Sequence, residues 1–197
     1  MITRPCEKGN EELKLTVDGK EMKLTLEKEI GKGSFGTVWL TKSGSLALAA
    51  KEVPKRNANG EEYMKEMDIM SHLDSKYVVR MYGSVVTDES FFIVMEYVPI
   101  GSLSSVLNSY SFSPFMRSRF ILDVARGMEY LHSQSVTHRD LKPGNVLVSS
   151  LDPSADVLCK FVFCFSSYLV SHPLFYLSSC FISCCTESPI LEHRRRD

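Results

Sequence analysis

Hydrophobic residues in the first hundred positions occur in short runs that alternate with polar residues. Residues 13–17 and 22–26 alternate loosely, and Asp18-Gly19 between them is a typical turn dipeptide, so the two segments are expected to form a β-hairpin. Ser43-Gly44 marks a second turn. The other expected strands cover residues 37–40, 46–53, 77–86 and 91–98.

A helical spacing of apolar residues first occurs over residues 61–73. Apolar side chains recur there every three residues and predict one buried face of a helix. The residues of this face are Met64, Met67, Met70 and Leu73. Glu66 lies next to these positions, so its carboxylate can point inward rather than to water.

After Gly101 the pattern becomes helical again. Ser113-Pro114 is a good N-cap and first-turn pair. Apolar residues then follow at helical spacing, namely Phe120, Ile121, Val124, Met128 and Leu131. Strands followed by helices predict the α+β class: a small sheet with one helix, and then an incomplete helical part.

Composition narrows the function classes only moderately. The chain has 197 residues, a formal net charge of -1, 44% hydrophobic and 24% charged residues, which suits one soluble domain or slightly more. Balanced charge disfavours a nucleic-acid partner. The first residues have no apolar run of a secretory signal, so the cytoplasm is the expected location. Five of the six cysteines lie between residues 159 and 185 without C-x-x-C spacing, which disfavours a zinc site.

The first motif is a glycine-rich turn that follows Ile30. It reads Gly31-Lys32-Gly33-Ser34-Phe35-Gly36-Thr37-Val38. Glycines let backbone N–H groups approach phosphate oxygens closely. An extended segment follows instead of a helix, which disfavours a dinucleotide-binding fold. Taken alone, the motif is equally consistent with a plain glycine-rich hairpin.

The second and third motifs are a lysine and a glutamate. Lys51 lies inside an apolar strand, where an ammonium group is costly unless it meets an anion. It either points to water at an edge or holds phosphate groups. Glu66, on the expected helix, is a candidate partner for Lys51, whereas Glu61 and Glu62 are expected to be solvated.

The fourth motif is the most specific one. It reads His138-Arg139-Asp140-Leu141-Lys142-Pro143-Gly144-Asn145-Val146-Leu147. A carboxylate at Asp140 can accept a hydroxyl proton, and Lys142 can balance phosphate charge. The amide oxygen of Asn145 is a hard ligand suited to Mg²⁺.

These four motifs, in this order, resemble the protein kinase family over residues 24–160. Residues 92–98 resemble its hinge, with Met95 as the gatekeeper. A lysine at position 142, two residues after Asp140, resembles the pattern of serine/threonine kinases. The sequences of residues 92–103 and 140–148 resemble those of the tyrosine-kinase-like group. The resemblance implies a kinase N-lobe of antiparallel strands plus one helix, and an incomplete helical C-lobe.

The resemblance also implies cofactors, partners and residue roles. ATP and Mg²⁺ would be the cofactors, and a protein with a serine or threonine the substrate. Asp140, Lys142 and Asn145 would be catalytic, with Asn145 as metal ligand. His138 would be mostly structural. The nucleotide would be held by Ile30, Gly31, Lys32, Gly33, Ser34, Phe35, Gly36, Val38, Ala49, Lys51, Glu66, Met95, Glu96, Val98 and Leu147, of which Val38, Ala49 and Leu147 would contact the adenine ring.

The family pattern ends at Lys160. The metal-binding Asp-Phe-Gly is expected near residues 163–165, where Phe163 stands in place of the aspartate, and no Asp-Phe-Gly occurs anywhere. The A-P-E segment is also missing. The expected organisation is an N-terminal extension (1–23), a partial kinase domain (24–160) and an apolar tail (161–197). The chain is therefore either a truncated kinase domain, a pseudokinase that only binds, or an inactive splice or gene-model product.

The tail itself has three interpretations. Residues 161–185 contain no Asp, Glu, Lys or Arg and are rich in Phe, Ser, Cys, Leu and Tyr. Such a stretch is typical of translated intron sequence, and Lys160-Phe161-Val162 can be encoded around a GT splice donor. Its length also suits a membrane segment, although His172-Pro173 and several serines interrupt it. The third interpretation is a divergent, packed β-rich end.

Overall fold

The computed structural model describes residues 12–17, 19–33, 36–57, 59–138 and 140–162. The described residues form two compact units. The N-terminal unit contains the residues up to Leu73 together with Arg80–Tyr97, and the C-terminal unit contains Asp74–Val79 and the residues from Val98 onward. The predicted tail lies outside the described residues beyond 162.

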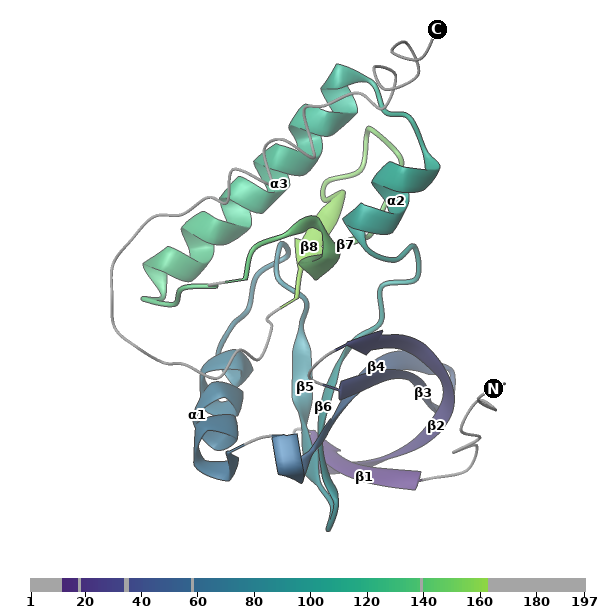
Figure 1. Cartoon of the computed structure of the whole chain (residues 1–197), viewed down its shortest axis with the longest axis vertical. Helices are drawn as coiled ribbons and strands as arrows, with labels where there is room; N and C mark the ends of the chain where they lie inside the picture. The colour runs from purple at the N-terminus through teal and green to yellow at the C-terminus, as the bar shows by residue number, and fades with distance from the viewer. Residues whose placement is uncertain (1–11, 18, 34–35, 58, 139, 163–197) are drawn as a thin grey trace, which may run out of the picture. The chain divides into compact units, whose positions relative to one another are not determined.

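The N-terminal unit is an antiparallel sheet with one helix (Figure 1). The strand order is β1-β2-β3-β4-β6-β5, which confirms the predicted α+β class. The strands are β1 (Glu12–Val17), β2 (Lys20–Gly33), β3 (Gly36–Ser43), β4 (Leu46–Pro54), β5 (Met81–Val86) and β6 (Ser90–Glu96), and a 3-10 turn covers Lys55–Asn57.

The predicted hairpin at the start of the chain is present. Leu13 pairs with Leu24, and Val17 pairs with Lys20, so two residues connect the strands. Gly19 has a φ of 75° in this connection, a left-handed conformation that two-residue hairpin turns require. The hairpin joins residues of the predicted N-terminal extension to the same sheet as the strands that follow.

One face of this sheet forms the core of the N-terminal unit. Side chains alternate between the two faces along each strand, and the apolar set of one face is almost completely buried. Its members are Leu13, Leu15, Leu24, Leu26, Trp39, Leu48, Ala50, Phe92 and Val94. These residues come from five of the six strands, so the core ties the whole sheet together.

Asn59 is the N-cap of helix α1 (Gly60–Ser71), and its side chain accepts a hydrogen bond from the backbone N–H of Glu61. Met67 and Met70 are buried as predicted, but the prediction for Met64 was wrong, because its side chain is 55% exposed. A recurrence of three residues drifts by about 60° per step around a helix of 3.6 residues per turn. Tyr63, rather than Met64, is buried on this side of the helix, and it stacks on Phe91 with 4.2 Å between the ring centroids.

The strand expected over 77–86 is shorter in the structure. β5 begins at Met81, and the preceding segment belongs to the C-terminal unit. There the backbone carbonyl of Tyr77 accepts from the N–H of Phe161, and the N–H of Val79 donates to the carbonyl of Phe161. Backbone pairing with a strand distant in sequence therefore shortens the predicted element.

The C-terminal unit consists of two helices and a small two-stranded sheet. Its elements are α2 (Leu103–Ser109), α3 (Pro114–Ser133), a 3-10 turn (Pro143–Asn145), β7 (Val146–Val148) and β8 (Cys159–Phe161). The Ser113 side chain accepts from the N–H of Met116, and Pro114 is in the first turn, as predicted. On α3, Phe120, Val124 and Leu131 are buried, whereas the predicted face residues Ile121 and Met128 are only partly buried.

Phe161 belongs to the packed core of the C-terminal unit. Only 1% of it is exposed, and it pairs with Val146 across the small sheet. A Cβ atom at Gly127 of α3 would collide with the Phe161 ring. The helix therefore approaches β8 so closely that only glycine fits at this point, and the folded region includes the first residue of the predicted tail.

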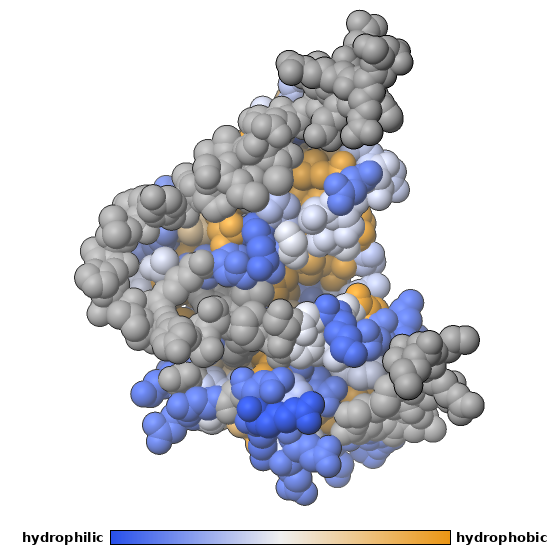
Figure 2. Space-filling view, viewed as in Figure 1, coloured by the Kyte–Doolittle hydropathy of each residue, from blue (hydrophilic) through white to orange (hydrophobic). Residues whose placement is uncertain are grey.

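The visible surfaces of the two units differ in character. Figure 2 shows mostly hydrophilic residues over the N-terminal unit, and larger hydrophobic areas over the C-terminal unit. Large apolar side chains exposed in the C-terminal unit include Tyr110, Phe115 and Leu122. Within the described ranges, the helices include none with the length and apolar character needed to cross a membrane.

Candidate active site

One face of the N-terminal sheet carries several of the predicted nucleotide-binding residues. Gly31 pairs with Val38, Val38 with Lys51, and Ala49 with Met95. Paired residues of antiparallel strands project to the same side, so these five residues share one face, which we call the Lys51 face. The apolar core occupies the opposite face. The alternation of the strands thus separates the candidate site from the core.

The start of β3, at the end of the glycine-rich motif, approaches β4 closely. Gly36 has a φ of 146°, and a Cβ atom there would collide with the backbone carbonyl of Glu52. Only glycine tolerates both this conformation and this contact. Gly33 pairs with Gly36, while Ser34 and Phe35 lie outside the described residues. Gly36, on the β3 side of the glycine-rich turn, therefore lies tightly against the strand that carries Lys51.

Glu52, next to Lys51, is a buried carboxylate that the sequence analysis missed. Its Oε2 accepts a hydrogen bond from the indole N–H of Trp39 at 2.9 Å. Its Oε1 accepts from the hydroxyl of Ser90 at 3.1 Å, and only 9% of the residue is exposed. Glu52 alternates with Leu48 and Ala50 onto the same, apolar face of β4. A glutamate at such a position was the sequence feature that could have identified it as buried. Its two bonds link β4 to β3 and β6 and so help to hold the strand that bears Lys51.

Glu66, the predicted partner of Lys51, is partly buried on α1. It lies on the helix between the directions of Met70 and Leu73, which are both buried. Its side chain is therefore near the packed side of α1, as the sequence pattern allowed. A pair between Glu66 and Lys51 remains a prediction.

The residues of the predicted hinge belong partly to the N-terminal unit and partly to the C-terminal unit. Met95 and Glu96 end β6 in the N-terminal unit, where the N–H of Glu96 donates to the carbonyl of Arg80 at 2.9 Å. Val98 is buried in the C-terminal unit. Leu147 also belongs to the C-terminal unit, where it is partly buried on β7. The residues predicted to contact adenine therefore come from both units.

The three predicted catalytic residues meet in the C-terminal unit. The Lys142 ammonium lies 2.8 Å from the Asp140 carboxylate oxygen Oδ2. The Asn145 amide donates to the same oxygen at 2.9 Å and to the backbone carbonyl of Asp140 at 2.7 Å. The short 3-10 turn Pro143–Asn145 folds Asn145 back onto Asp140. Their spacing in sequence thus corresponds to direct contact in space.

The environment of Asp140 favours its ionised form. Partial burial alone would raise the pKa of the carboxyl. The hydrogen bonds from Lys142 and Asn145, and the positive charge of Lys142, outweigh this effect and hold the pKa of Asp140 below its ordinary value of 3.8. Asp140 is therefore a carboxylate at neutral pH, ready to accept a hydrogen bond from a hydroxyl group.

The fit of this site to Mg²⁺ is incomplete. The Asn145 amide N–H groups are directed to Asp140, so its Oδ1 is the atom that suits a metal ion. The described part of the chain contains no group of three or more His, Cys, Asp or Glu that could hold a metal. Phe163, which stands where the family has its metal-binding aspartate, lies outside the described residues. Asn145 as a metal ligand thus remains a prediction, and the described residues around it do not complete such a site.

His138, at the start of the catalytic motif, is a packing residue. Only 2% of it is exposed, and its ring lies edge-on to Phe161 with 5.3 Å between centroids. Its Nε2 lies 2.9 Å from the carbonyl oxygen of Val162, a hydrogen bond in which the imidazole N–H donates. Burial holds the pKa of His138 below its ordinary value of 6.5, despite that hydrogen bond. The catalytic motif is therefore attached to β8 through a neutral imidazole.

This burial predicts a pH dependence of stability. The unfolded chain binds a proton at His138 near its ordinary pKa of 6.5, whereas the folded chain does so only at lower pH. Stability is therefore complete above that pH and falls by about 1.4 kcal/mol per pH unit between the two pKa values. Urea unfolding followed by circular dichroism at pH 7.5 and 5.5 measures this loss.

The control for this experiment is His138→Asn, which should lose less stability over the same range. Asp140 acts in a separate window, because its lowered pKa removes stability only as the pH falls below about 3.8. Equal losses in the two proteins between pH 7.5 and 5.5 would show that His138 is protonated in the folded chain.

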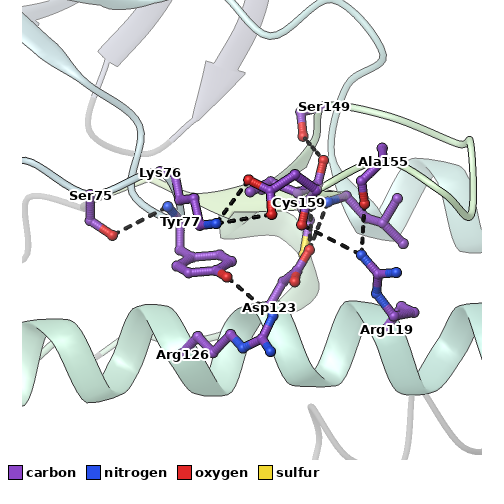
Figure 3. A network of polar contacts seen from close by, with 12 residues as sticks. Ser75, Lys76, Tyr77, Arg119, Asp123, Arg126, Ser149, Ala155 and Cys159 are labelled. Atoms are coloured by element: carbon purple, nitrogen blue, oxygen red, sulfur yellow. Dashed lines mark hydrogen bonds and ion pairs between the residues drawn. The ribbon is translucent and has the colours of Figure 1, made fainter.

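A second carboxylate that sequence reasoning missed is Asp123 on α3. It is fully buried, and its Oδ2 accepts from the backbone N–H groups of Leu158 at 2.7 Å and Cys159 at 3.3 Å (Figure 3). A buried carboxylate is costly unless donors of this kind are present. The signal was an aspartate within the apolar face between Phe120 and Val124. Asp123 fixes the start of β8 against the helix.

The loop between β7 and β8 is attached to α3 by further polar contacts. Arg119 donates to the carbonyls of Pro153 at 3.0 Å and Ala155 at 2.7 Å. Figure 3 shows the contact of Arg119 with Ala155 and the carboxylate contacts of Lys76, whose ion pair with Asp156 measures 2.8 Å. The ion pair is exposed and contributes little. The arginine contacts hold the loop so that β7, which directly follows Asn145, has a fixed partner strand.

Comparison with known proteins agrees with these observations. Residues 24–162 match the model of the protein kinase domain family. Serine/threonine-protein kinase 4 homolog B of Dictyostelium discoideum is 40% identical over 125 residues, which are 61% of this chain and 11% of that protein. MAP3K epsilon protein kinase 2 of Arabidopsis thaliana is 36% identical over 143 residues, 68% of this chain and 10% of that protein.

A solved structure is also similar. The crystal structure of Rad53 1-466 in complex with AMP-PNP superimposes with a TM-score of 0.63 and 28% sequence identity. The match covers 71% of this chain and 37% of that chain. The chain thus spans about a tenth of the length of the Dictyostelium and Arabidopsis kinases. Because the family model matches well over half of its residues, the chain belongs to the protein kinase family.

Proposed function

We propose that this chain is a nucleotide-binding portion of a serine/threonine protein kinase domain. The function of the domain is the transfer of the γ-phosphate of ATP to a serine or threonine hydroxyl of a protein. The observation that carries the proposal is the Asp140 carboxylate, held by Lys142 at 2.8 Å and by Asn145 at 2.9 Å. Relatives named as serine/threonine-protein kinases support the substrate class.

The chemistry assigned to the catalytic residues follows from their contacts. Asp140 is ionised and positioned to accept the substrate hydroxyl proton as the oxygen attacks phosphorus. Lys142 lies against the same carboxylate and steadies the negative charge of the transferred phosphate. Asn145 orients Asp140 through its amide N–H groups and would bind Mg²⁺ through Oδ1. Bound Mg²⁺ would neutralise charge on the phosphates.

The nucleotide itself is assigned to the Lys51 face. Lys51 holds the phosphates and pairs with Glu66, and the backbone of Gly31, Gly33 and Gly36 covers them. Val38, Ala49 and Leu147 contact the adenine ring, and the backbone of Glu96 and Val98 binds its edge, next to Met95. The close approach of Gly36 to the backbone of Glu52 on β4 supports this assignment.

Binding and transfer are separable in this protein. The residues proposed to bind nucleotide are all present, whereas the sequence contains no Asp-Phe-Gly. Nucleotide binding without transfer is therefore the behaviour that the printed sequence supports. Assignment to the tyrosine-kinase-like group and a cytoplasmic location remain predictions.

The first test is a substitution at the phosphate anchor. Lys51→Met removes the ammonium group while keeping an apolar stem of similar length. A hydrogen bond to a charged group contributes roughly 1.5–3 kcal/mol, so we expect the affinity for a fluorescent ATP analogue to fall by roughly tenfold to a hundredfold. Titration of the full chain by fluorescence anisotropy measures both proteins.

The matched control is Lys23→Met. Lys23 is exposed on β2, where it pairs with Lys14 across the hairpin, in the part of the strand that does not pair with β3. Its substitution should leave the affinity unchanged. Equal affinities of the wild-type and Lys51→Met proteins would refute the role of Lys51.

A further inference from the structure

The first strand of the protein lies outside the segment that matches the kinase family, which begins at residue 24. Nevertheless, its inward side chains are part of the core of the N-terminal unit. Leu13 is 2% exposed and Leu15 is 3% exposed, in the same cluster as Leu24 and Leu26 of β2. A segment that belonged to a separate extension would not bury two leucines among the strands of the domain.

β1 also brings the two ends of the sheet together. It lies against β5, although these are the first and last strands in the hydrogen-bonded order. At the contact, Leu15 covers Gly83, where a Cβ atom would lie 2.9 Å from Leu15 Cδ1. Gly83 has a φ of 152°, which further favours glycine. The two residues fit each other, and their contact packs β1 against β5.

The pairing pattern of β2 shows what β1 does for the candidate site. Residues 20–25 pair with β1, and residues 25–33 pair with β3, so Thr25 alone has a partner on both sides. Gly31 and Gly33 are at the far end of the same strand. The pairing with β3 shifts register twice between Leu26 and Gly31. Therefore β1 holds the root of the glycine-rich strand, and β3 holds its irregular far end.

We propose that Leu13 and Leu15 of β1 are positioning residues for the glycine-rich strand, so that nucleotide binding by this chain requires the residues from Glu12 onward. The inference rests on the proposed function for its link to ATP. An event that detaches β1, such as binding of another molecule to the hairpin, would lower nucleotide affinity without touching the Lys51 face. The N-terminal hairpin is thus a control point for the site.

The test uses Leu15→Asp in the full chain, with Thr16→Asp as its matched control. Thr16 is the next residue on the same strand, but its side chain is exposed. Hydrogen exchange followed by mass spectrometry reports on residues 28–33 and, as an internal reference, on α3. We expect hydrogen exchange of residues 28–33 to accelerate by about tenfold or more in Leu15→Asp, and to stay unchanged in Thr16→Asp. If the glycine-rich strand is correctly placed in only about one Leu15→Asp molecule in ten, the affinity for the fluorescent ATP analogue falls by about tenfold.

A milder pair of variants keeps the test decisive if Leu15→Asp unfolds the N-terminal unit. Leu15→Ala should accelerate exchange of 28–33 by a smaller factor, and Leu15→Met should restore the wild-type rate because it refills the same volume. Gly83→Ala should perturb 28–33 less when combined with Leu15→Ala than alone, since the shortened side chain removes the collision.

Two results would overturn the proposal. One is unchanged exchange of residues 28–33 in Leu15→Ala and Leu15→Asp. The other is a loss of protection that is equal across the N-terminal unit and unaccompanied by weaker binding per folded molecule, which would indicate only a structural role. If the wild-type chain binds no analogue, the proposed function fails, whereas the exchange measurements still judge the role of β1.

Discussion

A purified chain of this sequence is expected to transfer no measurable phosphate from ATP to serine or threonine residues of a protein. Phosphoryl transfer depends on positioning and on metal ions that neutralise charge between the β- and γ-phosphates. Asn145 would supply one metal ligand, but Phe163 stands where the family has its main metal-binding carboxylate. Loss of several kcal/mol of transition-state stabilisation lowers the rate by several orders of magnitude.

A radiolabelled transfer assay on a generic protein substrate measures this prediction. Asp140→Asn is the matched control, because it removes the proposed proton acceptor and detects any contaminating kinase. Equal background signal in both proteins agrees with the prediction. Activity that is present in the wild-type chain and disappears in Asp140→Asn would contradict it, and would show that another group completes the metal site.

The second large effect is expected at Phe161, where substitution by alanine should destabilise the C-terminal unit by about 3–5 kcal/mol. The ring is 1% exposed, lies against His138 and fills the space left by Gly127. Its removal leaves a cavity between α3 and the catalytic motif. Because single domains are stable by only about 5–15 kcal/mol, the unit would be close to unfolding at room temperature.

Urea unfolding followed by circular dichroism at 222 nm measures this effect, since α3 is the longest helix described. Phe115→Ala is the control, because it is the same substitution on the same unit at a side chain that is 60% exposed. It should change stability by less than about 0.5 kcal/mol. Similar losses in the two variants would mean that Phe161 is not part of the core, and that the fold of this unit ends before β8.

Most of the secondary structure was predictable from local pattern. The N-terminal hairpin, the strands after it and the capped start of α3 at Ser113 follow from turn chemistry, alternation and capping, which act over a few residues. The exceptions have a common cause. Met64 is exposed and β5 begins at Met81 rather than Tyr77, because packing partners distant in sequence decide which residues are buried or paired.

The candidate site divides in the same way. Asp140, Lys142 and Asn145 are close in sequence, and a short turn brings them into contact, so their motif was sufficient to predict their meeting. Glu52 and Asp123 were missed, because a charged residue on an apolar face is recognised only when its donors are known. These donors, such as the Trp39 indole, lie many residues away.

By itself, the sequence determined the protein kinase family and the α+β class, and it predicted which residues bind phosphate and accept a proton. Each of these depends on the identity and short-range order of residues. Only the tertiary structure decided that Leu13 and Leu15 belong to the core of the N-terminal unit, and that Phe161 belongs to that of the C-terminal unit. The physical reason is that burial depends on surfaces brought together from β1 and β5, or from α3 and β8, across long stretches of chain.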